Sequence, residues 1–127
     1  MNTLKELATL AIDGIKTQGD LAYDPSKGEC QLRTATGLKC AVGMLIEDQH
    51  YVSEMEIAAS PHHRGSRQVR EAIAVSNPTL NLDAEDWHAP YWTMLTKLQD
   101  AHDHSIDVPD FINNAKQMLS EQFGVVL

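Results

Sequence analysis

Apolar residues recur at every third or fourth position in several stretches of the chain, which is the spacing of an amphipathic α-helix. The stretches that this spacing predicts to be helices are residues 3–17, 67–75, 90–102 and the segment between Asp107 and Gly124. Residue types that favour helix ends flank them: Gly19, Ser66, Pro90, Asp107, Pro109 and Gly124. The pattern therefore predicts a mostly helical chain.

The region between the first two helices is less regular. Two short segments, Cys30–Arg33 and Leu38–Cys40, flank a glycine-containing turn, which predicts a small β-hairpin. Residues 40–48 are compatible with a short helix, although Gly43 in its middle costs about 1 kcal/mol relative to alanine. We therefore expect another group to pack closely against this glycine. Residues 50–65 lack periodicity and are expected to form a long loop.

These patterns together predict an α+β fold that is predominantly helical, with about five helices and one small β-hairpin. Residues 1–127 are expected to form a single globular domain, because the length suits one domain and no linker, repeat or low-complexity tract interrupts the chain. A hydrophobic content of 43% and a charged content of 22% are ordinary for a folded protein, which argues against disorder.

The chain is acidic, with a formal net charge of −8, and the charge is unevenly distributed. Residues 76–127 carry eight acidic and two basic residues, against ten and eight in residues 1–75. Such a surface repels phosphate backbones, so we expect no general nucleic-acid binding. An acidic face serves either solvation alone or contact with a basic partner.

Several classes of protein and site are not expected from the composition. No apolar run approaches the roughly 18–20 residues that span a bilayer, and the N-terminus has no signal-peptide pattern. We therefore expect no membrane association, and we expect Cys30 and Cys40 to be reduced thiols. Neither the two cysteines nor the six histidines have a zinc-site spacing, and no phosphate-binding glycine motif is present. We accordingly expect no metal and no cofactor.

Cys40 is the sharpest candidate for chemistry. A helix beginning there would lower the pKa of the thiol and favour the nucleophilic thiolate. His102 and Asp103 could then act as the base and its orienting acid, if the fold brings them back to Cys40. The alternative is that Cys40 is a small core residue, which is a common fate of a free cysteine.

A basic segment before the second predicted helix is a candidate anion site. Helix N-termini attract anions, and arginine side chains fit phosphate oxygens. The candidate residues are His63, Arg64, Ser66, Arg67 and Arg70. In the alternative interpretation, Arg67 and Arg70 pair with acidic residues of the second half of the chain.

The acidic second half offers a candidate protein interface. Aromatic residues at the start of a helix can anchor an interface, although core packing is their more frequent role. The candidate interface residues are Trp87, Tyr91, Trp92, Asp100, Asp103, Asp107 and Asp110. The oligomeric state is left open, and contacts between copies of the chain through residues 87–92 are one possibility.

Part of the chain resembles a pattern found in a group of small bacteriophage and prophage proteins. In this group, Cys-x-Tyr-Arg is followed by a short glycine turn and then by Lys-Cys-Ala-Val/Ile-Gly-x-Leu-Ile. The matching parts of this chain are Cys30–Arg33, Gly37 and Lys39–Ile46. Further blocks that share in the resemblance are Asp48, Tyr51, Met55–Glu56, Leu98–Gln99, His102–Asp103 and Phe123–Gly124. Leu32 departs from the pattern, because the group usually has an aromatic residue there. The resemblance covers about a third of the chain.

The resemblance implies a phage or prophage origin and a location in the host cytoplasm, and it brings no activity with it. Our first expectation is a non-enzymatic accessory protein that acts by binding and that could inhibit a host or defence factor. Its partner would be a host protein with a basic surface, or secondly a nucleotide-like signal molecule. The alternative is a cysteine-dependent hydrolase or transferase that uses Cys40 and His102.

Overall fold

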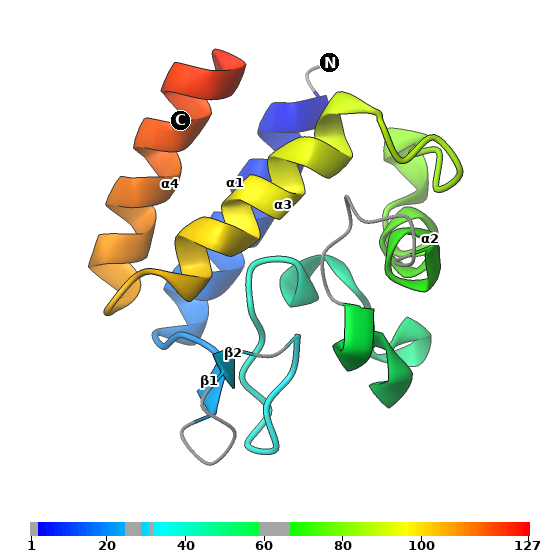
Figure 1. Ribbon diagram of the computed structural model, residues 1–127, viewed down its shortest axis with the longest axis horizontal. Coiled ribbons are helices and arrows are strands. Elements are labelled where there is room, and N and C mark those ends of the chain that lie inside the picture. The colour runs from blue at the N-terminus through cyan, green and yellow to red at the C-terminus, as the bar shows by residue number, and fades with distance from the viewer. Residues whose placement is uncertain (1–2, 25–28, 31, 59–66) are drawn as a thin grey trace.

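The structure, a computed structural model, describes residues 3–24, 29–30, 32–58 and 67–127. Four α-helices lie in these ranges: α1 (Thr3–Gln18), α2 (Arg67–Ser76), α3 (Pro90–Asp103) and α4 (Val108–Phe123). Four short 3-10 helices connect them: η1 (Gly43–Leu45), η2 (Asp48–His50), η3 (Ser53–Ala58) and η5 (Pro78–Leu80). Figure 1 shows α4 running antiparallel to α3 on one side of the molecule, with α2 on the opposite side.

The ends of α1 and α4 follow the predicted capping chemistry, whereas the predicted cap at Ser66 lies outside the described residues. The Asp107 carboxylate accepts a hydrogen bond from the Asp110 backbone N–H at 2.9 Å, and so caps α4 at its N-terminus. Gly124 then ends α4 in a left-handed conformation, with φ at 65°. Gly19 likewise follows α1 with φ at 81°, and its N–H donates to the Ile15 carbonyl. The four helix predictions are therefore confirmed, to within one or two residues at each end.

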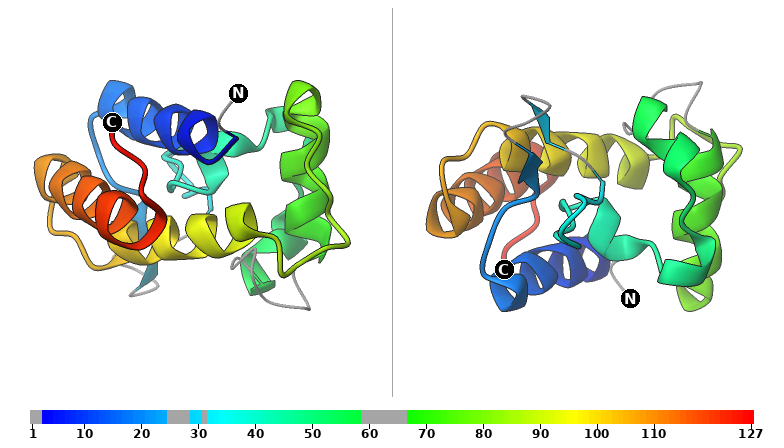
Figure 2. Two further views of the ribbon diagram at one scale, coloured as in Figure 1. Left: turned by 90° about the horizontal axis from the view of Figure 1, so that it is seen from above. Right: turned by 90° about the horizontal axis from the view of Figure 1, so that it is seen from below.

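The core forms where α1, α3 and α4 pack against one another and against the irregular segment that follows β2. From above, this segment runs between α1 and α3 towards α2, so helices surround it (Figure 2). Fully buried large side chains come from all of these elements: Leu7, Ile15, Leu32, Ile46, Trp92, Leu95, Leu98, Phe111 and Leu119. The apolar faces of the helices therefore do not form the whole core, because the irregular segment contributes part of it.

Side chains in and next to the surrounding helices form hydrogen bonds with backbone N–H and C=O groups of this irregular segment. The amide group of Gln18 accepts from the Lys39 N–H at 2.8 Å and donates to the Lys39 carbonyl at 2.9 Å, as a neighbouring strand would. Asn77, just after α2, donates to the Leu45 carbonyl at 3.0 Å. Buried N–H and C=O groups need such partners, because leaving one unpaired costs free energy comparable to a lost hydrogen bond.

The predicted fold class is wrong in two respects: the described chain has four α-helices rather than five, and it has no hairpin at residues 30–40. Only one isolated β-bridge, between Arg33 and Lys39, closes the turn there. The Leu32 N–H, which would extend the ladder, donates instead to the Glu56 carboxylate at 2.9 Å, and the Arg33 N–H donates to the same carboxylate at 3.0 Å. The class is accordingly predominantly helical rather than α+β.

The only regular strand pairing in the described ranges is very short and lies elsewhere. Strand β1 (Tyr23–Asp24) pairs antiparallel with β2 (Glu29–Cys30), and each strand has two residues. The predicted loop at residues 50–65 also needs correction, because its first part contains η3. Residues 59–65 of that loop lie outside the described ranges.

The predicted helix over residues 40–48 is replaced by turns and by η1 and η2. Ile46 is extended, with φ at −109° and ψ at 118°, which interrupts any helix through this region. The expected close packing at Gly43 is confirmed. A Cβ atom added there would lie 2.2 Å from the Leu32 carbonyl oxygen, so only glycine fits. Two backbone segments touch at this point, and no side-chain rotation can relieve the overlap.

We predict that G43A lowers the free energy of unfolding by at least about 2 kcal/mol, because the new methyl group meets a backbone carbonyl. The matched control is G14A in α1, where the added methyl meets the flexible Met44 side chain at 2.7 Å. There the helix propensity gained, about 1 kcal/mol, offsets the crowding. Urea denaturation measures both variants, and equal midpoints for them would contradict the close approach.

We further predict that E56A destabilises the fold by about 2–3 kcal/mol, because it leaves the N–H groups of Leu32 and Arg33 without their acceptor. E54A is the matched control: Glu54 lies in the same 3-10 helix with an exposed side chain, so its loss should change stability by less than about 0.5 kcal/mol. Thermal and urea unfolding provide the comparison. A similar loss in both variants would show that charge, and not the two hydrogen bonds, is what matters.

Candidate functional site

Cys40 lies inside the core, where its exposed fraction is 0%. Its sulfur accepts a hydrogen bond from the Gly43 N–H at 3.3 Å. Burial raises the pKa of the thiol from 9.0 to about 12, with Asp103 and Glu56 adding smaller effects in the same direction. No α-helix begins at Cys40, so no helix dipole acts to favour the thiolate. The environment therefore holds Cys40 as a neutral thiol.

His102 is also fully buried, and both of its ring nitrogens have partners within the protein. The Ala22 backbone N–H donates to Nε2 at 3.2 Å, so Nε2 must be unprotonated. This assigns the proton to Nδ1, which lies 3.1 Å from Oδ1 of Asp103. Asp103 thus contacts one nitrogen of the imidazole, while the other nitrogen accepts from the backbone. No hydrogen bond joins it to Cys40 in the described part of the chain.

Gln99 extends this network to the irregular segment. Its side-chain oxygen accepts from the Val42 N–H at 3.1 Å, and its nitrogen donates to the same Asp103 oxygen at 2.7 Å. Gln99 and His102 lie one turn apart on α3, so a single helix face holds two distant backbone segments. The arrangement is that of a structural network beside a buried thiol.

The candidate anion site is only partly within the described ranges, which exclude His63, Arg64 and Ser66. Arg67 pairs with both Glu71 and Glu85, each at 2.6 Å. Arg70 is buried, with an exposed fraction of 3%, and its Nε donates to the Ala84 carbonyl at 2.7 Å. Burial, aided by the neighbouring Arg67, lowers the pKa of Arg70. Both described arginines therefore bind groups of this chain, but only the Arg67–Glu85 pair involves an acid of the second half, and Arg70 binds a backbone carbonyl.

The aromatic residues of the candidate interface divide into a buried and a half-buried group. Trp92 is fully buried, and its indole N–H donates to the Asp83 carbonyl at 2.9 Å. Tyr91 is half-buried, and its hydroxyl accepts from the Asp83 N–H at 2.8 Å. Trp87 is half-buried and stacks against His88, with ring centroids 3.9 Å apart. Trp92 and Tyr91 thus fix the loop before α3, and Trp92 is unavailable to a partner.

The candidate acidic residues gather where α3 ends and α4 begins, a region that we call the α3–α4 corner (Asp100 to Asp110). The side chains of Asp107 and Asp110 are used locally: Asp107 caps α4, and Asp110 accepts from the Ile106 N–H at 3.0 Å. Asp103 binds Gln99 and His102. Asp100 is exposed, and its carboxylate makes no hydrogen bond to another described residue. Ile106 projects from the corner with an exposed fraction of 87%, which sequence analysis did not anticipate.

A second polar network lies on the irregular segment and the 3-10 helices that follow it. Arg33 pairs with Asp48 at 2.7 Å and lies over the Tyr51 ring, 4.5 Å from its centroid. Lys39 also reaches Asp48, at 3.3 Å, and the two cations lower the pKa of this carboxyl. Tyr51 donates to the Glu56 carboxylate at 2.5 Å; burial and this carboxylate raise the pKa of Tyr51 to about 12. These contacts tie together positions within residues 33–56.

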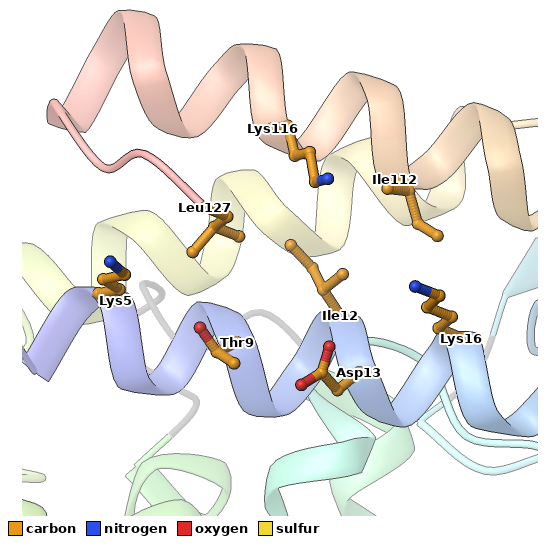
Figure 3. A pocket seen from close by; sticks show the side chains of 8 residues that line it. All are labelled: Lys5, Thr9, Ile12, Asp13, Lys16, Ile112, Lys116 and Leu127. Atoms are coloured by element: carbon orange, nitrogen blue, oxygen red, sulfur yellow. The ribbon is translucent and has the colours of Figure 1, made fainter.

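A groove between α1 and α4 is a third surface feature, and sequence analysis missed it. Its volume is about 280 Å³, and Figure 3 shows the side chains that line it: Lys5, Thr9, Ile12, Asp13, Lys16, Ile112, Lys116 and Leu127. The available signal was the spacing of positions 5, 9, 12 and 16, which places four of these residues on one edge of α1. Pairing that edge with α4 required knowledge of the tertiary structure.

Neither a metal site nor a membrane span emerges from the parts of the chain that the structure describes. Within them, no three His, Cys, Asp or Glu residues come together as a metal site would require. The described helices include none that is long and apolar enough to cross a membrane. Comparison of the chain with protein-family models, curated proteins and solved structures yields no match. The functional argument therefore depends on the geometry alone.

We predict that iodoacetamide at pH 8.5 leaves Cys40 of the folded protein unmodified, because the thiol is buried and its pKa is raised to about 12. Peptide mass spectrometry would distinguish Cys40 from Cys30, and alkylation in urea provides the positive control. Labelling of Cys40 in native buffer faster than global unfolding would instead show an accessible, reactive thiol.

The raised pKa of Cys40 also makes the stability of the fold depend on pH. The contribution of this thiol to the free energy of unfolding is fully present below pH 9, where the thiol is protonated in both the folded and unfolded states. It is lost between pH 9 and about 12, because only the unfolded chain releases the proton there, at up to about 1.4 kcal/mol per pH unit.

Proposed function

We propose that this chain is a non-enzymatic binding protein of phage or prophage origin, which occupies a basic surface of a host protein through the α3–α4 corner. The observation that carries the proposal is the exposure of Ile106, at 87%, among four carboxylates. A single exposed apolar side chain is common on protein surfaces, but here it lies within an acidic stretch of sequence, so it offers a basic partner an apolar contact beside the carboxylates.

The charge of the corner is uniform over a long stretch of sequence. Residues 98–115 include Asp100, Asp103, Asp107 and Asp110 but no lysine or arginine. Carboxylates arranged in this way attract a basic partner and accelerate encounter, while contributing less to the final affinity. Burial of the Ile106 side chain would then supply about 1.5–3 kcal/mol of binding free energy.

The corner is also held rigidly, which lowers the entropy cost of binding. Asp107 and Asp110 hydrogen-bond to backbone N–H groups on either side of the turn. Ser105 donates to the Ala101 carbonyl at 2.5 Å and accepts from Asn114 at 3.1 Å, so the turn is tied to both helices. These contacts present Ile106 in a fixed position.

The alternatives have less support in the geometry. A cysteine-dependent enzyme would need an accessible thiol, whereas Cys40 is buried and His102 binds backbone. A nucleotide-like ligand at the basic segment would need free arginines, whereas Arg67 and Arg70 bind groups of this chain. We therefore propose the protein partner alone.

The proposal is tested by retention of host-lysate proteins on the immobilised chain. We expect a protein that the wild type retains to be lost with the double variant I106S/D100N, since both changes fall on exposed side chains of the corner. Retention should also fall at least tenfold in about 1 M salt, where the Debye length is about 3 Å.

The matched control is V126S/E121Q, which removes one exposed apolar side chain and one exposed acid away from the corner. It should retain the same protein as the wild type. The same retention by I106S/D100N and the control, or insensitivity to salt, would show that the corner is not the contact surface.

A further inference from the structure

The groove between α1 and α4 has the charge of an anion site in an otherwise acidic protein. Three of the six lysines of the chain line it, and Asp13 is the one acidic side chain among the lining residues. The lining thus carries a local charge of about +2 in a protein whose net charge is −8. Figure 3 shows Lys16 and Lys116 reaching into the groove from opposite helices, with Lys5 at the far end beside Leu127. Oppositely charged ligands would therefore concentrate here.

The surface between these lysines is apolar. Ile12 from α1, Ile112 from α4 and Leu127 from the segment after α4 form it, and Thr9 contributes the one uncharged polar side chain of the lining. A ligand that matches both features must combine an anionic group with an apolar body. A purely ionic ligand, such as inorganic phosphate, would leave this apolar surface in water.

The dimensions of the groove decide between a peptide helix and a single extended chain. The lining runs along α1 from Lys5 to Lys16, which is about 16 Å at 1.5 Å per residue. A volume of about 280 Å³ spread over that length makes the groove long and shallow. A helix with its side chains is about 10–12 Å across, so it would lie mostly outside such a groove. The shape therefore favours one extended chain.

The polarity of the lining then decides between a peptide and a hydrocarbon chain. An extended peptide carries an N–H and a C=O group at every residue, and each would need a partner. The apolar surface of Ile12, Ile112 and Leu127 offers none, so a peptide would lose hydrogen bonds to water without replacing them. A hydrocarbon chain has no such requirement, and its burial is favourable.

We propose that the α1–α4 groove binds a medium-chain fatty acid, with its carboxylate between Lys16 and Lys116 and its alkyl chain along Ile12 towards Leu127. Neither of these two lysines makes an ion pair within the described ranges, whereas Lys5 already has an interaction partner. The volume equals that of about nine water molecules at about 30 Å³ each, which suits a ligand of eight to ten carbon atoms. This binding site is separate from the α3–α4 corner and goes beyond the proposed function.

The experiment is a calorimetric titration of the full chain with octanoate and decanoate at monomeric concentrations, with amide NMR shifts to locate the ligand. Each buried methylene group strengthens binding about fourfold, so decanoate should bind about fifteenfold more tightly than octanoate. Shifts should centre on Thr9, Ile12, Lys16, Ile112 and Lys116. Shifts centred elsewhere, or no heat and no shifts with either acid, would overturn the proposal.

Two variants test the role of charge. K16Q/K116Q should weaken decanoate binding at least tenfold without changing the melting temperature, because both side chains are exposed. K97Q is the matched control, since it removes an exposed lysine of α3 that does not line the groove. Unchanged affinity in K16Q/K116Q, or equally tight binding of a cationic amphiphile of the same chain length, would overturn the proposed carboxylate site.

Discussion

The structure depends on satisfying the backbone of a segment that is both buried and irregular. Residues 32–46 pass between α1 and α3 with only one β-bridge and one 3-10 turn, yet much of this segment is shielded from water. Those buried backbone groups that are not paired within the segment therefore need a partner from elsewhere. Gln18, Glu56, Asn77 and Gln99 provide such partners, and each comes from a different element of the chain. The helices thus both enclose the segment and supply its hydrogen bonds.

This requirement gives a physical role to a small set of buried and half-buried polar residues. Gln99 and His102 fix the backbone at Val42 and Ala22, and Glu56 fixes the backbone after β2. Gly43 permits the close passage of two backbone segments. These residues determine the path of the chain, whereas the two proposed binding surfaces lie on the α3–α4 corner and on the α1–α4 groove.

Sequence analysis predicted the helices well and the region between α1 and α2 poorly, for one physical reason. Helix periodicity and capping are local, so Gly19, Asp107 and Gly124 could be assigned from their neighbours. The hydrogen bonds that shape the irregular segment are not local: Gln99 and Val42 are 57 positions apart. Nothing in the alternation around the predicted hairpin indicated that Glu56 would take an N–H group needed for strand pairing.

The candidate sites show the same difference between features that depend on local sequence and features that depend on tertiary contacts. The acidity of the α3–α4 corner is contiguous in sequence and was predictable, whereas the α1–α4 groove joins residues 5–16 with residues 112–127 and required the fold. Exposure of Ile106 could not be predicted, because its neighbourhood reads as an ordinary turn before a capped helix. For Cys40, the sequence left a nucleophile and a core residue as alternatives, and its surroundings favour the core residue.

The hydrogen bond between Ala22 and His102 spans 80 positions, and this separation bears on how the protein matures. During synthesis on the ribosome, α1 and the chain after it emerge long before α3 does. The early part can form its local helix, but its final path is fixed only when α3 arrives. Non-local pairing of this kind slows folding, because loop entropy is lost before the contacts compensate for it. The nascent chain thus exposes its future interior until more than three quarters of the protein has been translated.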